Sequence, residues 1–307
     1  MAALRRSEVR WSHASVILLA LLGCGGAPFR GGPSAVDDWG RTVTLAAPAR
    51  RIVSLSPSTT EIVFALGLGE RLAGRTRWCD YPPAARAVAD VGDGLAPNVE
   101  VVAARRPDLV LLYASAANRA AAERLADLGI AAFALALDRA GDVPRAARRI
   151  AVLAGDSAAG AALAAAFDSA RAQARRETAA RSGTGARPRL YVHVWADPPI
   201  TVGRGSYLHE ILADAGAENV FADVESSSAG VSLEAVARRD PDAVVVLAAD
   251  TLAPAPALAR RAPWRAVRAV REGRYLVLDG VLYGRPSPRM PLAVRDLAVR
   301  LARLGAR

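Results

Sequence analysis

Two segments of this chain repeat each other without a gap. The run VEVVAARRPDLVLL begins at Val99, and the run LEAVARRDPDAVVV begins at Leu233. Pairs of identical residues lie at a constant offset of 134 positions: Glu100 and Glu234, Val102 and Val236, Pro107 and Pro241, Asp108 and Asp242. Each copy reads as a short helix that opens with Glu, is stopped by Pro and leads into a buried strand. Any helix–turn–strand unit rich in Ala, Arg and Val resembles another, but the equal offsets favour two halves of one architecture.

Short runs of strand-forming residues alternate with helical stretches in both halves. Strands are expected at residues 51–55, 109–113, 131–135, 190–194, 243–247 and 275–278. Helices are expected at residues 57–66, 118–128, 207–215 and 291–304. Ser58 or Thr59 is expected to cap the first of these helices. Because such alternation is typical of sheets with crossover connections, the chain predicts an α/β fold with two lobes.

A single long helix is predicted between the two halves. Gly155, Asp156 and Ser157 break the preceding pattern, and Asp156 or Ser157 can cap a helix that runs to about Arg181. About 24 residues at about 1.5 Å each give a rod of about 36 Å, long enough to lie behind two lobes. We therefore expect an N-terminal α/β lobe at residues 50–141, a bridging helical segment at 142–183 and a C-terminal α/β lobe at 184–307. One rigid connection of this kind allows only a small hinge motion.

The N-terminal residues are typical of a secretory signal. Arg5, Arg6 and Arg10 precede an apolar run at residues 14–23, which is shorter than the roughly 20 residues that span a bilayer. The run ends in Leu-Leu-Gly-Cys, which resembles a bacterial lipobox with Cys24 as the lipidated residue; the alternative is a short helix with an incidental cysteine. We expect a signal peptide at 1–23, a flexible tether at 24–49 and an extracytoplasmic or periplasmic lipoprotein. Its lipid would anchor it to the membrane without a membrane-spanning segment.

Composition and motif content exclude several functional classes. The 40 basic residues are all Arg, so a formal net charge of +10 reflects a composition bias and does not indicate a nucleic-acid partner. Two Cys can form neither a disulfide framework nor a four-thiolate zinc site. Beyond the signal only His193 and His209 remain, and the chain has no G-x-S-x-G, P-loop or G-x-G-x-x-G motif. We expect no enzyme, no metal site and no cofactor, with His193 in a strand and His209 on a helix surface.

Aromatic residues and an arginine recur where the predicted strands end. Trp78 and Tyr81 lie in the loop 77–83, and the others follow later strands: Tyr113, Trp195, Tyr283 and Arg285. In open α/β sheets such positions line the ligand crevice. Flat rings on loops bind large, partly apolar ligands with little loss of entropy. Each aromatic residue alone suits a core, but their common placement predicts a cleft between two lobes.

Three sequence segments resemble the periplasmic substrate-binding proteins of iron-siderophore, haem and cobalamin importers. They are RIVSLSPSTTE from Arg51, Asp80-Tyr81-Pro82-Pro83, and Pro107-Asp108-Leu109-Val110. The resemblance extends from about Arg50 to the C-terminus and is strongest to the cobalamin binders. It implies the class III, helical-backbone fold, a monomer that holds its ligand between two α/β lobes, an ABC importer permease as partner, and no catalysis.

The resemblance also implies roles for individual residues. Trp78, Tyr113, Trp195 and Tyr283 lie at or beside aromatic positions that contact the corrin ring, and Arg285 lies at an arginine position near the ligand. Glu100 and Glu234 match the two carboxylates that dock on the permease, although Glu is also favoured at any helix start. Two tryptophans of the cobalamin binders map near Gly94 and Ser228. Haem binding through His193 or Tyr113 therefore stays open. So does siderophore binding, for which the candidate cations are Arg77, Arg204, Arg285 and Arg289.

Overall fold

The computed structural model describes residues 31–181, 186–248 and 257–305, so the predicted signal peptide and Cys24 lie outside the described residues. Part of the predicted tether is folded. Strands β1 (Ser34–Val36) and β2 (Thr42–Thr44) pair antiparallel around a turn in which the Asp37 carboxylate accepts the backbone N–H groups of Trp39 and Arg41. Leu45 and Ala49 are then buried in the core. The tether expected at 24–49 is thus too long, because residues 34–49 pack on the first lobe.

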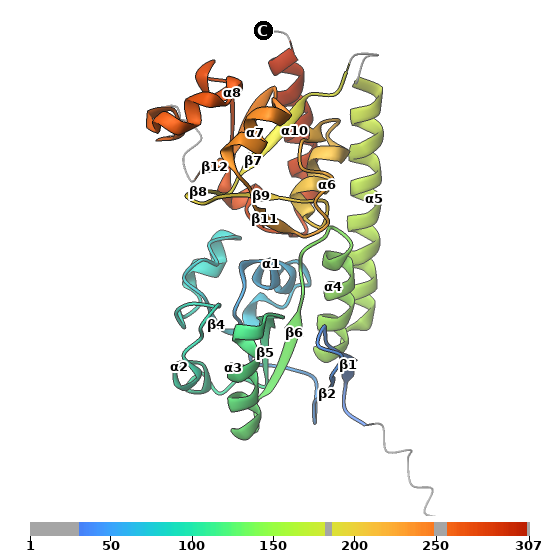
Figure 1. Ribbon diagram of the computed structural model, residues 1–307. Coiled ribbons are helices and arrows are strands. Elements are labelled where there is room, and N and C mark those ends of the chain that lie inside the picture. Colours follow the sequence, from blue (N-terminus) through green and yellow to red (C-terminus); the bar gives the residue numbers. More distant parts are fainter. Residues whose placement is uncertain (1–30, 182–185, 249–256, 306–307) are drawn as a thin grey trace, which may run out of the picture. The chain divides into compact units, whose positions relative to one another are not determined.

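The first half contains a four-stranded parallel sheet (Figure 1). Its order is β4 (Leu72–Arg75), β3 (Ile52–Ser54), β5 (Leu109–Tyr113) and β6 (Ala131–Leu135). The helices of this half are α1 (Pro57–Ala65), α2 (Val99–Ala103) and α3 (Ala116–Asp127), with 3-10 turns η1 (Gly69–Arg71) and η2 (Pro83–Ala87). The strands expected at 109–113 and 131–135 are confirmed. The expected cap is wrong: Ser56 precedes α1, while Ser58 and Thr59 are buried inside it.

The second half repeats this sheet in the same order. Its parallel strands are β10 (Glu218–Asn219), β7 (Arg189–His193), β12 (Ala243–Ala248) and β13 (Tyr275–Asp279). A small antiparallel sheet of β8 (Trp195–Ala196), β9 (Pro199–Val202) and β11 (Ser228–Gly230) lies beside it. The helices are α6 (Tyr207–Asp214), α7 (Leu233–Arg239), α8 (Arg268–Arg271), α9 (Gly280–Tyr283) and α10 (Met290–Gly305), with turns η3 (Ala257–Arg260) and η4 (Ala262–Ala266). No helix among the described residues is long and apolar enough to span a membrane.

The sequence repeat corresponds to a repeated local structure. After α2 and α7 the chain turns through a left-handed residue, Arg106 with φ 48° and Asp240 with φ 42°, again 134 positions apart. The Asp108 carboxylate accepts the backbone N–H of Arg51 at 2.8 Å, and the Asp242 carboxylate accepts that of Arg189 at 2.9 Å. Each aspartate therefore ties the start of its own central strand to the start of the first strand. The predicted duplication of architecture is confirmed.

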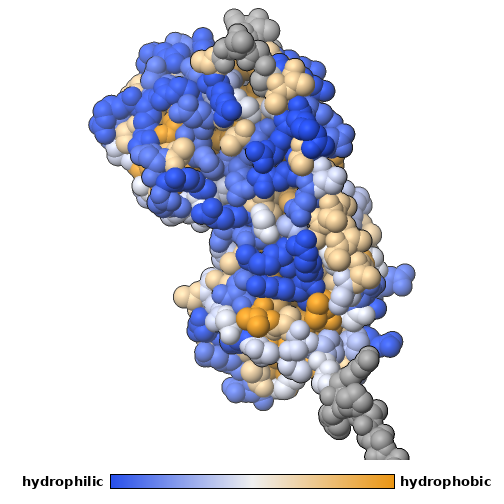
Figure 2. Space-filling view, turned by 90° about the vertical axis from the view of Figure 1, so that its right-hand side faces the viewer, coloured by the Kyte–Doolittle hydropathy of each residue, from blue (hydrophilic) through white to orange (hydrophobic). Residues whose placement is uncertain are grey.

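One long helix connects the halves, as the sequence predicts. After α4 (Asp142–Leu153) the chain turns at Gly155, with φ +81°, and enters α5 (Ser157–Arg181) of 25 residues, about 37 Å long. Asp156 caps this helix by accepting the N–H of Ala159. Helix α5 packs against α4 of the first half and against α10 and α6 of the second. On the face that contains α5, hydrophilic and hydrophobic residues are intermixed, and strongly hydrophobic residues form only small patches (Figure 2).

Candidate functional site

The loop that follows β4 exposes two aromatic rings. Trp78 is 60% exposed and Tyr81 is 36% exposed, whereas Cys79 between them is fully buried. The Cys79 sulfur lies 3.1 Å from the Thr60 hydroxyl and 3.2 Å from that of Thr76. Because the buried thiol fixes the middle of the loop, its neighbours project outward. Residues 77–81, which we call the aromatic loop, thus present ring faces at the carboxyl end of β4.

Two arginines of the second half contact this loop. The Arg285 guanidinium donates to the Asp80 carboxylate at 2.7 Å and to the Trp78 carbonyl at 3.4 Å. The Arg289 guanidinium binds both oxygens of Glu61, at 2.6 and 2.7 Å, and lies 3.7 Å from the centre of the Tyr81 ring. Glu61 belongs to α1 and is only 3% exposed. The candidate site therefore contains residues of both halves in direct contact.

Tyr113 lies at the end of β5, where the sequence predicts it. Its hydroxyl donates to the Asp138 carboxylate at 2.9 Å, and the ring is partly buried. Desolvation, together with this acidic partner, raises the pKa of Tyr113 to about 12. The phenol is therefore protonated at neutral pH and already engaged with a neighbour.

Trp195 lies on the hairpin of β8 and β9, close to the end of β7. It is 61% exposed, and its indole N–H donates to the Asp197 carbonyl at 3.0 Å. Beside it is a cavity of about 310 Å³ lined by His193, Val194, Trp195, Ala196, Asp197 and Arg261. This cavity lies on the second half and brings together an exposed indole, an imidazole and a guanidinium.

The His193 imidazole in this cavity is held neutral. Desolvation lowers its pKa to about 4, with a smaller contribution from the Arg261 charge. The ring lies edge-on against Trp264, with centroids 5.2 Å apart, and its buried Nδ1 atom has no hydrogen-bond partner among the described residues. His209, expected on a helix surface, is instead partly buried, and its pKa is lowered by desolvation. Neither histidine belongs to a cluster that could hold a metal within the described part of the chain.

The Tyr283 side chain is buried in the core and not exposed. Tyr283 ends the four-residue helix α9, which turns the side chain into the core, where it is fully buried. Its hydroxyl contacts the Ala293 carbonyl at 2.9 Å and the Asp296 carboxylate at 2.7 Å. Desolvation, and to a smaller extent Asp296, raises the pKa of Tyr283 well above the ordinary value of a tyrosine. The prediction that this ring faces the ligand is wrong, because the sequence locates the strand end but not the turn that follows it.

Most of the predicted cations already have acidic partners. Arg285 and Arg289 bind Asp80 and Glu61, and Arg204 binds Glu225. Arg77 is exposed, and its charge makes a small contribution to the lowered pKa of Asp93. At Gly94, near which the sequence resemblance places a tryptophan of the cobalamin binders, an added Cβ would lie 2.0 Å from the Leu55 carbonyl oxygen. The local backbone therefore excludes a side chain at this position.

Glu100 and Glu234 occupy equivalent first turns. Each follows a capping residue, Asn98 before α2 and Ser232 before α7, and each is exposed. The Glu100 carboxylate pairs with Arg124 at 2.6 Å. The pKa of Glu234 is lowered by its own backbone N–H and by the Ser232 hydroxyl. Both helices thus present an exposed acidic side chain from their first turn.

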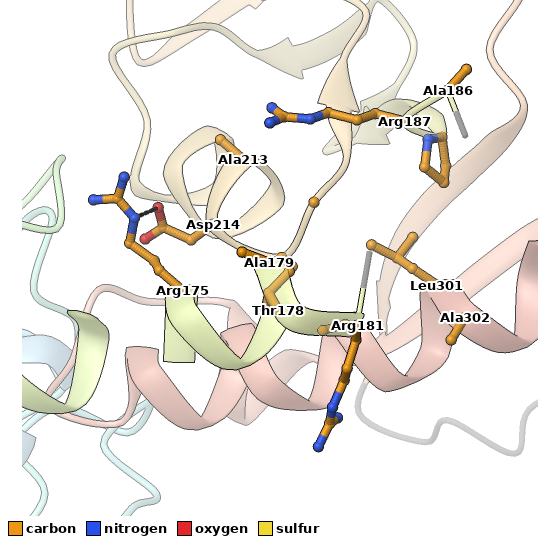
Figure 3. A pocket seen from close by; sticks show the side chains of 14 residues that line it. Arg175, Thr178, Ala179, Arg181, Ala186, Arg187, Ala213, Asp214, Leu301 and Ala302 are labelled. Atoms are coloured by element: carbon orange, nitrogen blue, oxygen red, sulfur yellow. Dashed lines mark ion pairs between the residues drawn. The ribbon is translucent and has the colours of Figure 1, made fainter. Parts of the chain in front are cut away.

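A larger cavity, of about 710 Å³, lies away from these residues (Figure 3). It is bounded by the end of α5, the end of α6, and α10, and Arg175 in its wall pairs with Asp214 at 3.3 Å. None of the predicted site residues lines it. The residues that sequence reasoning missed are Glu61 and Asp80; a lone Glu inside the apolar helix at 57–66 was a signal, since a buried carboxylate requires a partner.

Two lobes of one topology, joined by one long helix and in contact through the Arg285–Asp80 and Arg289–Glu61 ion pairs, are typical of a two-lobed solute-binding protein. Residues 52–282 match the family model described as periplasmic binding protein. The chain therefore belongs to the periplasmic binding protein family, whose matched relatives are transport binding proteins and not enzymes.

Individual relatives carry different names. The chain is 27% identical over 265 residues to the vitamin B12-binding protein of Pectobacterium atrosepticum, covering 86% of this chain and 92% of that one. It is 30% identical over 272 residues to an uncharacterised ABC transporter substrate-binding lipoprotein of Bacillus subtilis, covering 87% and 84%. Among solved structures, the periplasmic haem-binding protein RhuT from Roseiflexus sp. RS-1, in apo form, superposes with a TM-score of 0.74 at 25% identity, covering 83% of this chain and 99% of that one.

Proposed function

We propose that this protein captures cobalamin or a related corrinoid between its two lobes and delivers it to an ABC importer. The observation that carries the proposal is the pair of exposed indoles, Trp78 at 60% and Trp195 at 61%, one from each half. Exposed aromatic rings at the carboxyl ends of strands in an α/β fold are candidate ligand contacts. A broad, flat, partly apolar ligand would cover both rings at once.

The charges around the aromatic loop favour a ligand of low net negative charge. Arg285 and Arg289 are already neutralised by Asp80 and Glu61. An anionic siderophore would have to displace the nearly fully buried Glu61 from Arg289 and the partly exposed Asp80 from Arg285, which leaves Arg77 as the exposed cation of the loop. A corrinoid, whose periphery is mostly amide, requires no such exchange.

Haem is the second candidate, and His193 is the observation in its favour. A neutral imidazole is the form that ligates iron, and the lowered pKa of His193, about 4, keeps it neutral across the physiological range. Its neighbour Trp195 would stack on the porphyrin. The resemblance to a haem-binding structure supports this alternative.

The proposal extends to anchoring and to the permease. The lipobox at residues 21–24 and the lipoprotein among the relatives support a lipid on Cys24, with the mature protein in the periplasm or outside the cytoplasm. Glu100 and Glu234 project from equivalent first turns of the two halves, which suits a two-point contact with arginine pockets on a permease.

One screen tests these assignments. Thermal unfolding of the purified protein is followed with cyanocobalamin, haemin and a ferric hydroxamate siderophore, and any hit is measured by calorimetry. A ligand at one hundred times its dissociation constant stabilises the folded protein by about 2.7 kcal/mol, which gives a clear shift. Stabilisation by cyanocobalamin supports the proposal. A Soret band in the presence of haemin with no response to cyanocobalamin transfers the assignment to haem.

A further inference from the structure

Glu61 is a buried charge whose partner comes from the other half of the chain. It lies in α1 between Thr60 and Ile62, all of them buried, and its side chain is 2% exposed. A carboxylate in such a place is unfavourable unless it is paired and hydrogen-bonded. Arg289 provides both bonds from a position 228 residues further along the chain. The ion pair therefore exists only while the two halves are held together.

Both arginines contact an acid and a part of the aromatic loop. Arg285, which is 12% exposed at its side chain, holds Asp80 and the Trp78 carbonyl, and its guanidinium also lies 3.8 Å from the Glu61 carboxylate. Arg289, which is 13% exposed, holds Glu61 and stacks on the Tyr81 ring. Two guanidinium groups and two carboxylates balance in charge. The loop that carries the exposed Trp78 ring is thus anchored in the first half by Cys79 and is held on its other side by two arginines of the second half.

We propose that Arg285 and Arg289 are positioning residues for ligand capture. Arg285 holds the aromatic loop through Asp80 and the Trp78 carbonyl, and Arg289, which is paired with Glu61 of α1, holds it through the Tyr81 ring. The loop is thus held against the second half before the ligand arrives, so that the Trp78 ring is preorganised. Preorganisation raises affinity because less conformational entropy is lost on binding. The role of Trp78 as a ligand contact rests on the proposed function, whereas the fixing of the loop does not.

Cys79 reports on the loop without any ligand. Its thiol is fully buried at the centre of the aromatic loop, so a maleimide can reach it only when the loop opens. Trypsin cleaves after Arg77 and Arg86, which places Cys79 alone in the peptide 78–86. Mass spectrometry of that peptide follows the labelling of Cys79 in the full chain, separately from Cys24.

The test compares N-ethylmaleimide labelling of Cys79 in the wild type, Arg285→Ala and Arg289→Ala. Arg285→Ala leaves the partly exposed Asp80 without its partner and removes a 3.8 Å contact to Glu61, which keeps both of its bonds to Arg289, so this variant is expected to fold. We expect at least a tenfold faster labelling in both variants, with Arg285→Lys between Arg285→Ala and the wild type. The matched control is Arg295→Ala, which removes an ion pair of 2.8 Å to Glu177 of α5 and does not touch the loop.

Urea unfolding of the same proteins separates loop opening from global unfolding. Labelling that rises only as much as in Arg295→Ala, or only in proportion to the loss of global stability, overturns the positioning role. The positioning role is supported if Cys79 in Arg285→Ala and Arg289→Ala is labelled faster than in Arg295→Ala and faster than the loss of global stability predicts.

The ligand found by the screen gives a second readout. In a double-mutant cycle, a positioning residue acts through the residue that it holds, so the losses from Trp78→Ala and Arg285→Ala are expected to be clearly less than additive. Additive losses would mean that Arg285 acts independently of the loop and overturn the positioning role. If no tested ligand binds the wild type, the ligand assignment fails while the labelling result stands on its own.

Discussion

At the residue scale, His193 connects burial to a measurable pH dependence. Its pKa in the folded chain, about 4, lies below the ordinary value of 6.5 because the ring is desolvated and Arg261 is near. Between these pH values the unfolded chain binds more protons than the folded chain, so the free energy of unfolding rises with pH across this window. We expect stability to fall as pH drops from 6.5 towards 4. The slope from His193 stays below about 1.4 kcal/mol per pH unit, because the partial exposure of the ring lets water screen the effect.

Urea unfolding at several pH values between 4 and 7 measures this contribution. The control variant is His193→Gln, which keeps a polar side chain but does not titrate. His209 and the acidic residues contribute in both proteins, so the relevant quantity is the difference between their two slopes. Equal slopes in the wild type and the variant would show that His193 is not held neutral by its surroundings.

The exposed indoles are the residues on which ligand binding should depend most. We expect Trp78→Ala and Trp195→Ala each to weaken binding of the identified ligand by about 1–3 kcal/mol, measured by calorimetry. Leu128→Ala is a control of similar kind, because Leu128 is 59% exposed and lies at the end of α3. Unchanged affinity in both tryptophan variants would remove the rings from the binding site.

The sequence predicted the exposure of a residue correctly where that residue lies in a loop directly after a strand. Trp78 and Trp195 follow strands and are exposed, as expected of loops at strand ends. Tyr283 also follows a strand, but the short helix α9 turns it inward to the Asp296 carboxylate, and no periodicity in four residues reveals that turn. The acid partners of Arg285 and Arg289 were missed because pairing across more than 200 residues leaves no local pattern.

At the element scale, the contact of α4 with α5 depends on a glycine. A Cβ added at Gly160 would lie 2.5 Å from the Ala151 Cβ and 3.0 Å from the Arg148 Cα, so the two helices approach too closely for a side chain. We expect Gly160→Ala to destabilise the protein by about 1–3 kcal/mol, even though alanine favours a helix by up to about 1 kcal/mol. Urea unfolding measures the change.

Gly141 provides the matched control, because it precedes α4 and has nothing within 4 Å of an added Cβ. We expect Gly141→Ala to change the free energy of unfolding by no more than about 0.5 kcal/mol. If Gly160→Ala were as stable as the wild type, the close approach of α4 and α5 would not be required for the fold.

Strands and helices with a long apolar run or a regular spacing of apolar residues could be predicted from the sequence, whereas the shortest strands could not. The buried strands β5 and β6 and the helix α5 follow directly from continuous apolar runs and helical spacing. The strands β1, β2, β8, β9 and β11 have two to four residues each, too few for an alternation to be recognised. Residues 34–49 were assigned to the tether for the same reason.

At the scale of the whole molecule, the internal sequence repeat was the feature that best predicted the architecture. Equal offsets in the sequence predicted two halves of one topology, and both sheets have the same strand order with their aspartate ties in equivalent places. The sequence could not show how the halves contact each other, because that contact depends on the arginines and acids of the site. The repeat also places Glu100 and Glu234 in corresponding first turns, which leads to a prediction about transport.

Charge reversal of both glutamates should separate binding from delivery. Both are exposed and lie outside the residues of the candidate site, so we expect Glu100→Arg/Glu234→Arg to bind ligand like the wild type. Arginines in their place would repel arginine pockets on a permease, so uptake of the ligand by cells should be abolished. The control is Asp168→Arg/Glu218→Arg, which changes the net charge equally at exposed positions on α5 and β10. Uptake that persists in the first variant, or is lost equally in the control, would refute docking through this pair.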